Sequence, residues 1–269
     1  MRRFALALIV VLLGAVVADA QWFRQRRAPP RLPTVDSFDG TFNFCRGMFQ
    51  SVYREPGGQG WWTDYPDADI NFSIRLSELT KTRVSRLPDG TPNHLVVRLT
   101  DDELFKCPYL HMEDVGTMGL SLDEVERLRE YLLKGGFLWV DDFWGEEAWR
   151  NWEHTIGTVL SPAEYPIHDV TPDHLLYRIM FQIEEFPQIP AISFWRRTGG
   201  ATSERGWESQ QVNVRGISDS KGRLMVLMTH NTDISDSWER EAEDPRFFYL
   251  FSPNGYAVGI NVMMYAMTH

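Results

Sequence analysis

The sequence predicts one α/β domain built as a three-layer sandwich, with a mostly parallel central sheet between two layers of helices. Segments with strand and helix patterns alternate along the chain, which is typical of parallel α/β folds. The strands expected at 94–99 and 137–142 are nearly continuous apolar runs, as in sheets covered on both faces. A chain of 269 residues is also long enough to bury a full hydrophobic core.

Clusters of glycine, proline and aspartate divide the first half of the chain into shorter segments. Residues 42–53 are rich in aromatic side chains and partly alternate, which predicts the first strand. Ile70, Ile74 and Leu79 lie roughly at helical spacing and predict a helix. The expected segments are the strand in 42–53, a loop at 55–69, a helix at 70–82, a turn at 87–93, a strand at 94–99 and a short strand at 107–113.

The second half contains the clearest helix signal. Ser121 and Glu124 form a capping box, and Gly135 and Gly136 mark the end of the helix that follows. Residues 161–210 show no pattern that assigns an element. The other expected segments are a strand at 137–142, a helix at 146–160, a hairpin at 211–231 that turns at 219–222, and an apolar helix at 255–267.

The N-terminus has the pattern of a secretory signal peptide. Arg2 and Arg3 precede a fourteen-residue apolar run, and Ala18 and Ala20 form the small-residue cleavage pattern. Fourteen apolar residues are fewer than the roughly 20 that a spanning helix needs. We therefore expect residues 1–20 to be cleaved after Ala20, and the protein to be secreted or periplasmic. An Arg/Pro-rich leader at 21–37 and a single domain at 38–269 would follow.

The charge and the cysteines limit the partners and the chemistry. The formal net charge of −10 argues against nucleic acid or anionic lipid as a main partner. Cys45 and Cys107 are the two cysteines of the chain, and in an oxidising compartment they can form one disulfide. A buried free thiol is the alternative, and a catalytic thiol is the weakest of the three hypotheses.

Polar side chains follow several of the expected strands. Because the carboxyl ends of parallel strands meet at one edge of a doubly wound sheet, these side chains should converge on one crevice. The candidate ligand-binding residues at these positions are Asp101, Asp102, Glu103, His111, Glu113, Asp141, Asp142, His230, Asn231 and Asp233.

Asp141 and Asp142 lie where a buried strand meets a helix, and they are the candidate catalytic residues. They could act as a general base, as metal ligands or as acceptors for sugar hydroxyls. Structurally, an Asp at this place is a preferred helix N-cap. His111, Glu113 and His230 could join them around a divalent metal, but no metal-binding motif supports this, so we predict no metal site and no cofactor.

Aromatic side chains offer a second hypothesis for ligand binding. Trp61 and Trp62 lie in a polar loop beside Asp64, an arrangement that suits stacking on a sugar ring. The alternative is that both rings pack against the sheet, and that the polar N–H group of each ring only finds a hydrogen-bond partner there.

Four segments of the chain together resemble the bacterial family called domain of unknown function 4159. They are 65–80, 99–112, 120–145 and 255–269, and the resemblance extends over about residues 42–269. It implies a flavodoxin-like, class I glutamine-amidotransferase-like fold in a family with no assigned activity.

In true amidotransferases a strand runs into a tight elbow that carries a nucleophilic Cys. The corresponding junction here, 140–145, contains no Cys, Ser or Thr, and neither cysteine of the chain lies there. Covalent acyl transfer therefore lacks its first component.

Three functions remain open. The leading hypothesis is a non-catalytic domain that binds a ligand or protein partner in the cell envelope, with a glycan as one class of ligand. The first alternative is a hydrolase that uses Asp141 or Asp142 without a covalent intermediate, with or without a metal. The second is an assembly module that forms homo-oligomers through the helix at 255–267, which is too short to span a membrane. Gly255 and Gly259 would permit close contact in a dimer, although we favour a place for this helix in the core.

Overall fold

The structure, a computed structural model, describes residues 28–269. The expected signal peptide and residues 21–27 of the leader lie outside the described residues. Residues 31–269 form one unit, and Arg31 already takes part in it, since its carbonyl oxygen accepts a hydrogen bond from Val96 N at 2.9 Å. Contacts with the domain therefore begin inside the range assigned to the leader. Among the described residues, no helix combines the length and apolar character needed to cross a bilayer.

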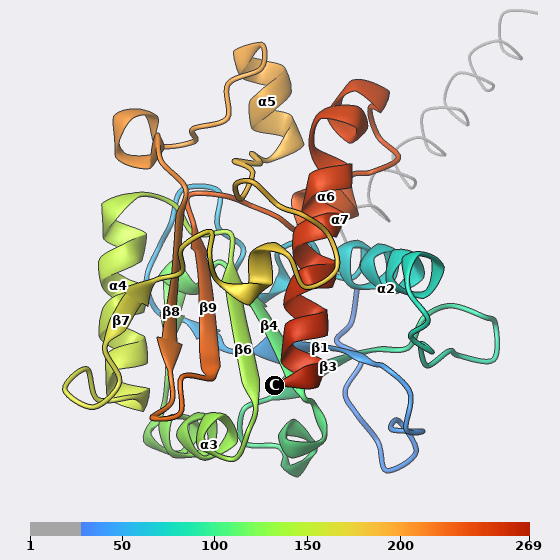
Figure 1. Ribbon diagram of the computed structural model, residues 1–269, viewed down its shortest axis with the longest axis vertical. Helices are drawn as coiled ribbons and strands as arrows, with labels where there is room; N and C mark the ends of the chain where they lie inside the picture. The colour runs from blue at the N-terminus through green and yellow to red at the C-terminus, as the bar shows by residue number, and fades with distance from the viewer. Residues whose placement is uncertain (1–27) are drawn as a thin grey trace, which may run out of the picture. The chain divides into compact units, whose positions relative to one another are not determined.

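A mostly parallel seven-stranded sheet forms the centre of the domain, in the order β3-β1-β4-β6-β9-β8-β7 (Figure 1). The pairs β1–β3, β1–β4, β4–β6 and β6–β9 are parallel, and β8 is antiparallel to both of its neighbours. The predicted α/β class with a mostly parallel sheet is confirmed. The strands are β1 (Phe44–Met48), β3 (His94–Arg98), β4 (Tyr109–Glu113), β6 (Phe137–Asp141), β7 (Ile167–Asp169), β8 (Asn213–Ser218) and β9 (Leu224–His230).

The central strands are buried on both faces, which explains their continuous apolar sequences. Successive side chains point to opposite faces, so Tyr109 and Trp139 join one hydrophobic cluster while Leu110 and Val140 join the other. Because of the same alternation, two neighbouring polar residues at the end of one strand point to opposite faces of the sheet. This property positions the groups described below.

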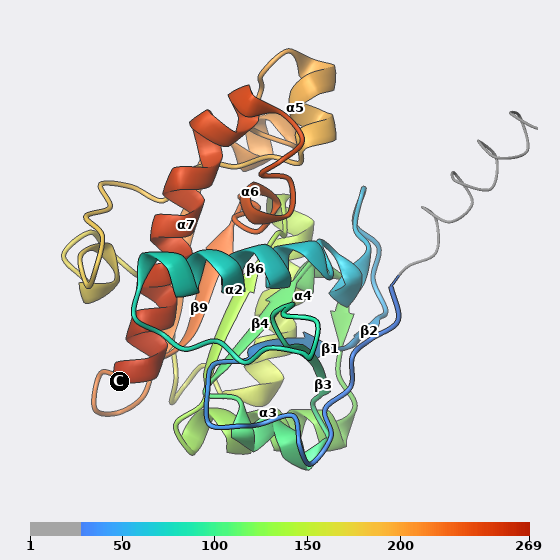
Figure 2. The ribbon, with the colours of Figure 1, turned by 90° about the vertical axis from the view of Figure 1, so that its right-hand side faces the viewer.

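Helices cover both faces of the sheet (Figure 2). Phe72 of α2 and Tyr256 of α7 belong to the first cluster, and Leu128 of α3 and Trp152 of α4 belong to the second. The helices are α2 (Asp67–Leu79), α3 (Leu122–Leu133), α4 (Gly145–Val159), α5 (Ile192–Thr198), α6 (Asp236–Glu239) and α7 (Pro245–Thr268).

Several element boundaries differ from the expected ones. The first strand is interrupted after Met48, and Gln50–Ser51 (β2) pairs instead with Met118–Gly119 (β5) in a separate two-stranded sheet. The C-terminal helix starts ten residues earlier than expected, because Asp244 caps it and Pro245 fits the first helical turn. β7 lies in the part of the chain to which the sequence assigned no element.

The two glycines of α7 are used within the chain. A Cβ atom on Gly259 would lie 2.4 Å from Trp238 and 2.7 Å from Phe72, and one on Gly255 would lie 1.9 Å from Ser237 Oγ. The two glycines therefore allow α7 to pack closely against α2 and α6, as expected if this helix lies in the core. A homo-oligomer through this helix stays a prediction.

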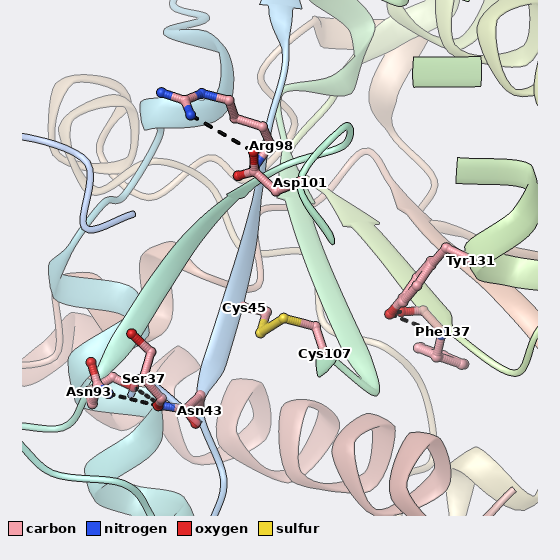
Figure 3. Close-up of a disulfide and its surroundings, with 9 residues drawn as sticks. All are labelled: Ser37, Asn43, Cys45, Asn93, Arg98, Asp101, Cys107, Tyr131 and Phe137. Atoms are coloured by element: carbon pink, nitrogen blue, oxygen red, sulfur yellow. Dashed lines mark hydrogen bonds and ion pairs between the residues drawn. A yellow bond between two sulfur atoms is a disulfide. The ribbon is translucent and has the colours of Figure 1, made fainter. Parts of the chain in front are cut away.

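A disulfide joins Cys45 of β1 to Cys107, which precedes β4 (Figure 3). Both sulfur atoms lie in the cluster on the α3 and α4 face of the sheet. The bridge spans a sequence separation of 62 residues and ties two neighbouring strands together. It thereby restricts the unfolded chain over a long segment that includes α2 and β3.

Removing this disulfide should destabilise the fold. For a loop of this length, we expect the double variant Cys45→Ala, Cys107→Ala to lose about 2–4 kcal/mol of free energy of unfolding, because the unfolded chain regains entropy. Guanidinium unfolding of both proteins, with and without reductant, measures the difference. The double variant should not respond to reductant, and a wild-type protein that is equally stable when reduced would contradict the prediction.

Candidate functional site

A cavity of about 560 Å³ opens at the carboxyl ends of the parallel strands. Asp114 follows β4, Asp142 follows β6 and Asp233 follows β9, and all three line it. The loop before α2 and the segment around α5 complete the wall. Its acidic side chains are Glu55, Asp64, Asp114, Asp142, Glu204, Asp233, Asp236 and Glu243, and its basic side chains are Arg196, Arg197, Arg205 and Arg240.

The position in the sheet is the one where α/β folds bind ligands. The five parallel strands lie side by side in the order β3-β1-β4-β6-β9. If they are numbered 1 to 5 along the chain, this order reads 2-1-3-4-5, so the direction of winding reverses between β1 and β4. Ligands of doubly wound sheets bind outside the carboxyl ends of the strands at such a switch point. Asp114 lies directly after β4 at this point.

Unusual backbone conformations concentrate at this edge. The non-glycine residues with positive φ in the described part of the chain are Asp64 at 58°, Asp114 at 53°, Asp142 at 50° and Asn231 at 65°. Asp and Asn tolerate this conformation better than other residues, but it still carries strain. Three of the four line the cavity, and such strain is typical of functional sites.

Asp141 and Asp142 have different environments. Asp141 is fully buried on the face of the sheet that α2 and α7 cover, where it accepts hydrogen bonds from Thr229 Oγ1 at 2.5 Å and from the N–H groups of Ile234 at 2.7 Å and Ser235 at 3.3 Å. These bonds fix the loop that leads into α6. Asp141 is therefore a structural residue and does not line the cavity.

Asp142 lines the cavity, and its Oδ1 accepts a hydrogen bond from Trp144 Nε1 at 2.9 Å. The N-cap position of α4 is Trp144, without a side-chain capping bond. The hypothesis that one of the two aspartates caps α4 is therefore wrong. The reason is that the chain turns through positive φ at Asp142, which directs this carboxylate to the cavity.

Burial and mutual repulsion raise the pKa values of the cavity carboxyl groups. Burial, followed by the charge of Asp114, raises the pKa of Glu55 to about 8. Burial also raises the pKa of Asp114 to about 6, against the hydrogen bond from Gly60 N. The pKa of Asp142 is raised well above its ordinary value by burial and by the charges of Asp114 and Glu204. The pKa values of Asp64, Asp233 and Asp236 are raised for the same reasons.

A second polar cluster lies inside the same edge of the sheet, and Arg46 is its central cation. Arg46 Nε bonds Asp69 Oδ1 at 3.0 Å, and its Nη1 bonds Glu113. His111 Nε2 lies 3.0 Å from Glu113 Oε1. Although burial acts to raise the pKa of Glu113, the charge of Arg46 lowers it to about 2. His111 and Glu113 are thus parts of a buried ion-pair network and lie outside the cavity wall.

Ser235 completes a group that resembles a hydrolytic triad but has a different geometry. In a Ser-His-acid triad, one imidazole nitrogen contacts the serine and the other contacts the acid. Here Ser235 Oγ and Glu113 Oε1 both lie 3.0 Å from Nε2 of His111. All three residues are completely buried. This group cannot present a nucleophile to a substrate.

His230 and Asn231 connect the end of β9 to the start of α4. His230 Nε2 donates to Gly145 O at 2.9 Å, and Asn231 Oδ1 accepts from Gly145 N at 2.9 Å. Burial lowers the pKa of His230 to about 4, so its ring is neutral near pH 7. Both residues support the cavity wall from behind.

The acidic residues after β3 lie elsewhere. β3 is an edge strand, and Asp101 pairs at 3.8 Å with Arg98, the last residue of this strand (Figure 3). Asp102 pairs with Arg127, and Glu103 pairs with Lys106. None of the three acidic residues is part of the cavity wall described above. The expected convergence therefore includes β4, β6 and β9 but excludes β3.

Trp61 and Trp62 stack on each other with ring centroids 4.0 Å apart. Trp61 is buried in the hydrophobic cluster of the α3 and α4 face, and Trp62 packs against the same cluster. Both rings therefore follow the packing alternative, and neither is part of the cavity wall.

Sequence reasoning missed most of the acidic wall. Asp114 directly follows the last residue of β4, so the rule that selected Asp142 could also have selected it. The remaining missed residues come from loops and from the short helix α6, where no periodic pattern indicates their place. They are Glu55, Asp64, Glu204, Asp236, Glu243 and, beside the wall, Glu239.

The two adjacent aspartates should respond differently to truncation. Asp141→Ala leaves the N–H groups of Ile234 and Ser235 without an acceptor, and we expect a loss of about 2–4 kcal/mol of stability. Asp142→Ala removes one hydrogen bond and places Ala at a φ of 50°, but it also relieves repulsion, and should cost about 1 kcal/mol. Chemical unfolding of both variants measures this, and equal losses would contradict the assignment.

The stability of the protein should fall as the pH rises above about 5. Glu55 and Asp114 have folded-state pKa values of about 8 and about 6, above those of the unfolded chain. Their contribution is therefore complete below their unfolded-state values and is lost as the pH rises through the folded-state values. His230 acts in the opposite direction, because its lowered pKa costs stability as the pH falls below about 6.5.

Thermal unfolding in the presence of EDTA measures this dependence. We expect the highest midpoint near pH 5 and a loss of more than ~1 kcal/mol by about pH 9. The variant Glu55→Gln should reduce the alkaline slope. A midpoint that increases from about pH 6 to 9 would exclude this electrostatic description.

Comparison with known families gives one match. The model of a family described as Domain of unknown function (DUF4159) matches residues 50–267, which is most of the chain. A comparison with curated proteins gave no significant match. The family expected from the four sequence segments is thus confirmed, and the chain belongs to the family described as Domain of unknown function (DUF4159).

Proposed function

We propose that this protein is a non-catalytic ligand-binding domain of the cell envelope, and that its binding site is the cavity at the strand ends. The observation that carries the proposal is the concentration of carboxyl groups from three neighbouring strand ends around a space of about 560 Å³. This volume lies within the range of small-molecule sites, roughly 300–1,000 Å³. The strained aspartates and the raised pKa values at the same place support it.

The chemistry of the wall favours a ligand rich in hydrogen-bond donors. Carboxylates accept from hydroxyl and ammonium groups, and a positively charged group would also reduce the repulsion between them. Trp144 and Phe194 add aromatic surface to the wall, and Arg205 adds a donor. A glycan that carries hydroxyl and free amino groups meets all of these requirements.

Covalent acyl transfer is disfavoured by the chemistry of the available nucleophiles. Both cysteines of the chain are joined in the disulfide, and the junction between β6 and α4 contains no hydroxyl side chain. The order of the parallel strands supports a flavodoxin-like arrangement of the amidotransferase-like type. We propose this superfamily as the structural origin of a domain that lacks the amidotransferase nucleophile.

An envelope location is part of the proposal. The signal-peptide pattern at 1–20 supports export, and a disulfide is stable in oxidising compartments such as the periplasm. The secreted or periplasmic location therefore stays a proposal that rests on these two features.

A hydrolase without a covalent intermediate is the second candidate. Asp142 favours it, because this carboxylate lines the cavity and its raised pKa suits a general base. A hydrolase would release product from an envelope glycan, whereas a binding domain would leave the glycan intact. Product analysis after prolonged incubation separates the two functions.

Oligosaccharide titration tests the proposed site. Glucosamine oligomers should raise the unfolding midpoint, and N-acetylglucosamine oligomers, which lack the charge, should do so less. At ~100 times the dissociation constant, binding should add about 2.7 kcal/mol to the stability. Asp142→Ala should abolish the rise, and Asp102→Ala, at a side chain that is 95% exposed, should retain it. A midpoint unaffected by every oligomer would refute the proposed ligand class.

A further inference from the structure

We propose that Asp64, Asp236 and Glu239 bind one divalent metal cation at the wall of the strand-end cavity. The inference deepens the proposed function, since Asp64 and Asp236 also line that cavity. Carboxylate oxygens are the ligands that Ca²⁺, Mg²⁺ and Mn²⁺ prefer over softer metals. We therefore expect a cation of this class.

The three side chains have suitable geometry. Each offers one oxygen atom, and these atoms all lie within 4.8 Å of one another. Oxygen atoms bound to one Ca²⁺ at ~2.4 Å can be at most ~4.8 Å apart. Asp236 and Glu239 are three residues apart on α6, and such residues face the same side of a helix. Asp64 faces them from the turn that precedes α2.

Asp64 supplies an independent indication of a ligand. The residue is only 8% exposed, and its Oδ2 has no hydrogen-bond donor among the described residues. Buried carboxylate oxygens are nearly always paired, because burial removes their hydration. An unpaired oxygen that belongs to a group of converging carboxylates is what a cation would satisfy.

The charges around the three carboxylates leave an excess of negative charge. Arg240 is the nearest cation, with Nε at 2.5 Å from Glu239 Oε2 and at 3.6 Å from Asp236 Oδ1. The same guanidinium also binds Glu243, at 2.7 Å. Arg240 therefore supplies one positive charge to the three carboxylates of the site and to Glu243.

The fixed bonds leave suitable oxygens available. Asp236 Oδ2 accepts the N–H of Ile192 at 2.8 Å, whereas Oδ1 has only the longer 3.6 Å ion pair with Arg240 Nε and remains for a metal. The cavity side of the site leaves room for water or for a hydroxyl group of the proposed ligand, which would complete the coordination. The metal would then contribute directly to binding in the cavity.

Calorimetric titration of the EDTA-treated, dialysed protein with CaCl₂, MgCl₂ and MnCl₂, without any oligosaccharide, tests the site. At least one cation should bind with one-to-one stoichiometry. Asp64→Asn and Glu239→Gln should each weaken binding at least tenfold. The matched control Glu204→Gln, in the same cavity wall but outside the three ligands, should change the affinity less than threefold.

Thermal unfolding of the metal-free variants separates a ligand from a structural residue. If Asp64 is a metal ligand, Asp64→Asn should unfold at a higher temperature than the metal-free wild-type protein and should no longer respond to the metal. Arg240→Met should bind the cation more tightly, because a competing charge is removed. Absence of one-to-one binding to the wild type, or binding unchanged in Asp64→Asn and Glu239→Gln, would overturn the proposal. If Asp64→Asn and Glu239→Gln still bind oligosaccharide, the proposed function remains intact even when the metal site is refuted. If the wild-type protein binds the metal but no oligosaccharide, only the proposed function is refuted.

Discussion

The convergence of acidic strand ends on one edge of the sheet is the constraint on which this structure depends. Parallel strands must all end on the same side, and β4, β6 and β9 are each followed by an aspartate that lines the same cavity. Carboxylates that are buried together repel one another and lose hydration, so the arrangement costs stability unless protons or cations compensate it. Folding alone does not require such a cluster.

The two polar clusters of the domain show two solutions to this problem. In the inner cluster, Arg46 lies between Asp69 and Glu113 and holds the pKa of Glu113 at about 2, so a cation of the chain itself stabilises the ionised carboxylates. In the cavity, Glu55 and Asp114 have raised pKa values, and Arg205 and Arg240 do not neutralise the whole wall. The carboxylates of the inner cluster thus share a cation of the chain, while the acidic wall of the cavity is suited to a ligand with positive charge.

The sequence was sufficient to predict the class of fold and part of the site. Apolar runs buried on two faces predicted β3 and β6, the capping box predicted α3, and the strand-end rule selected Asp142 and Asp233. The rule failed for Asp101 to Glu103, because the position of β3 at the sheet edge depends on strand order, which no local pattern specifies. It failed for Asp141 because a single change of φ at Asp142 directs adjacent side chains to different environments.

The central claim is that crowded, buried carboxyl groups form the cavity, and NMR titration of the side-chain carboxyl ¹³C signals tests it most directly. Glu55 should titrate at about 8 and Asp114 at about 6 in the metal-free protein. A bound cationic ligand should lower both pKa values, because positive charge favours the ionised form. If both groups titrate in the ordinary range of carboxylic acids, the cavity is hydrated and its acidic wall is only a solvated surface.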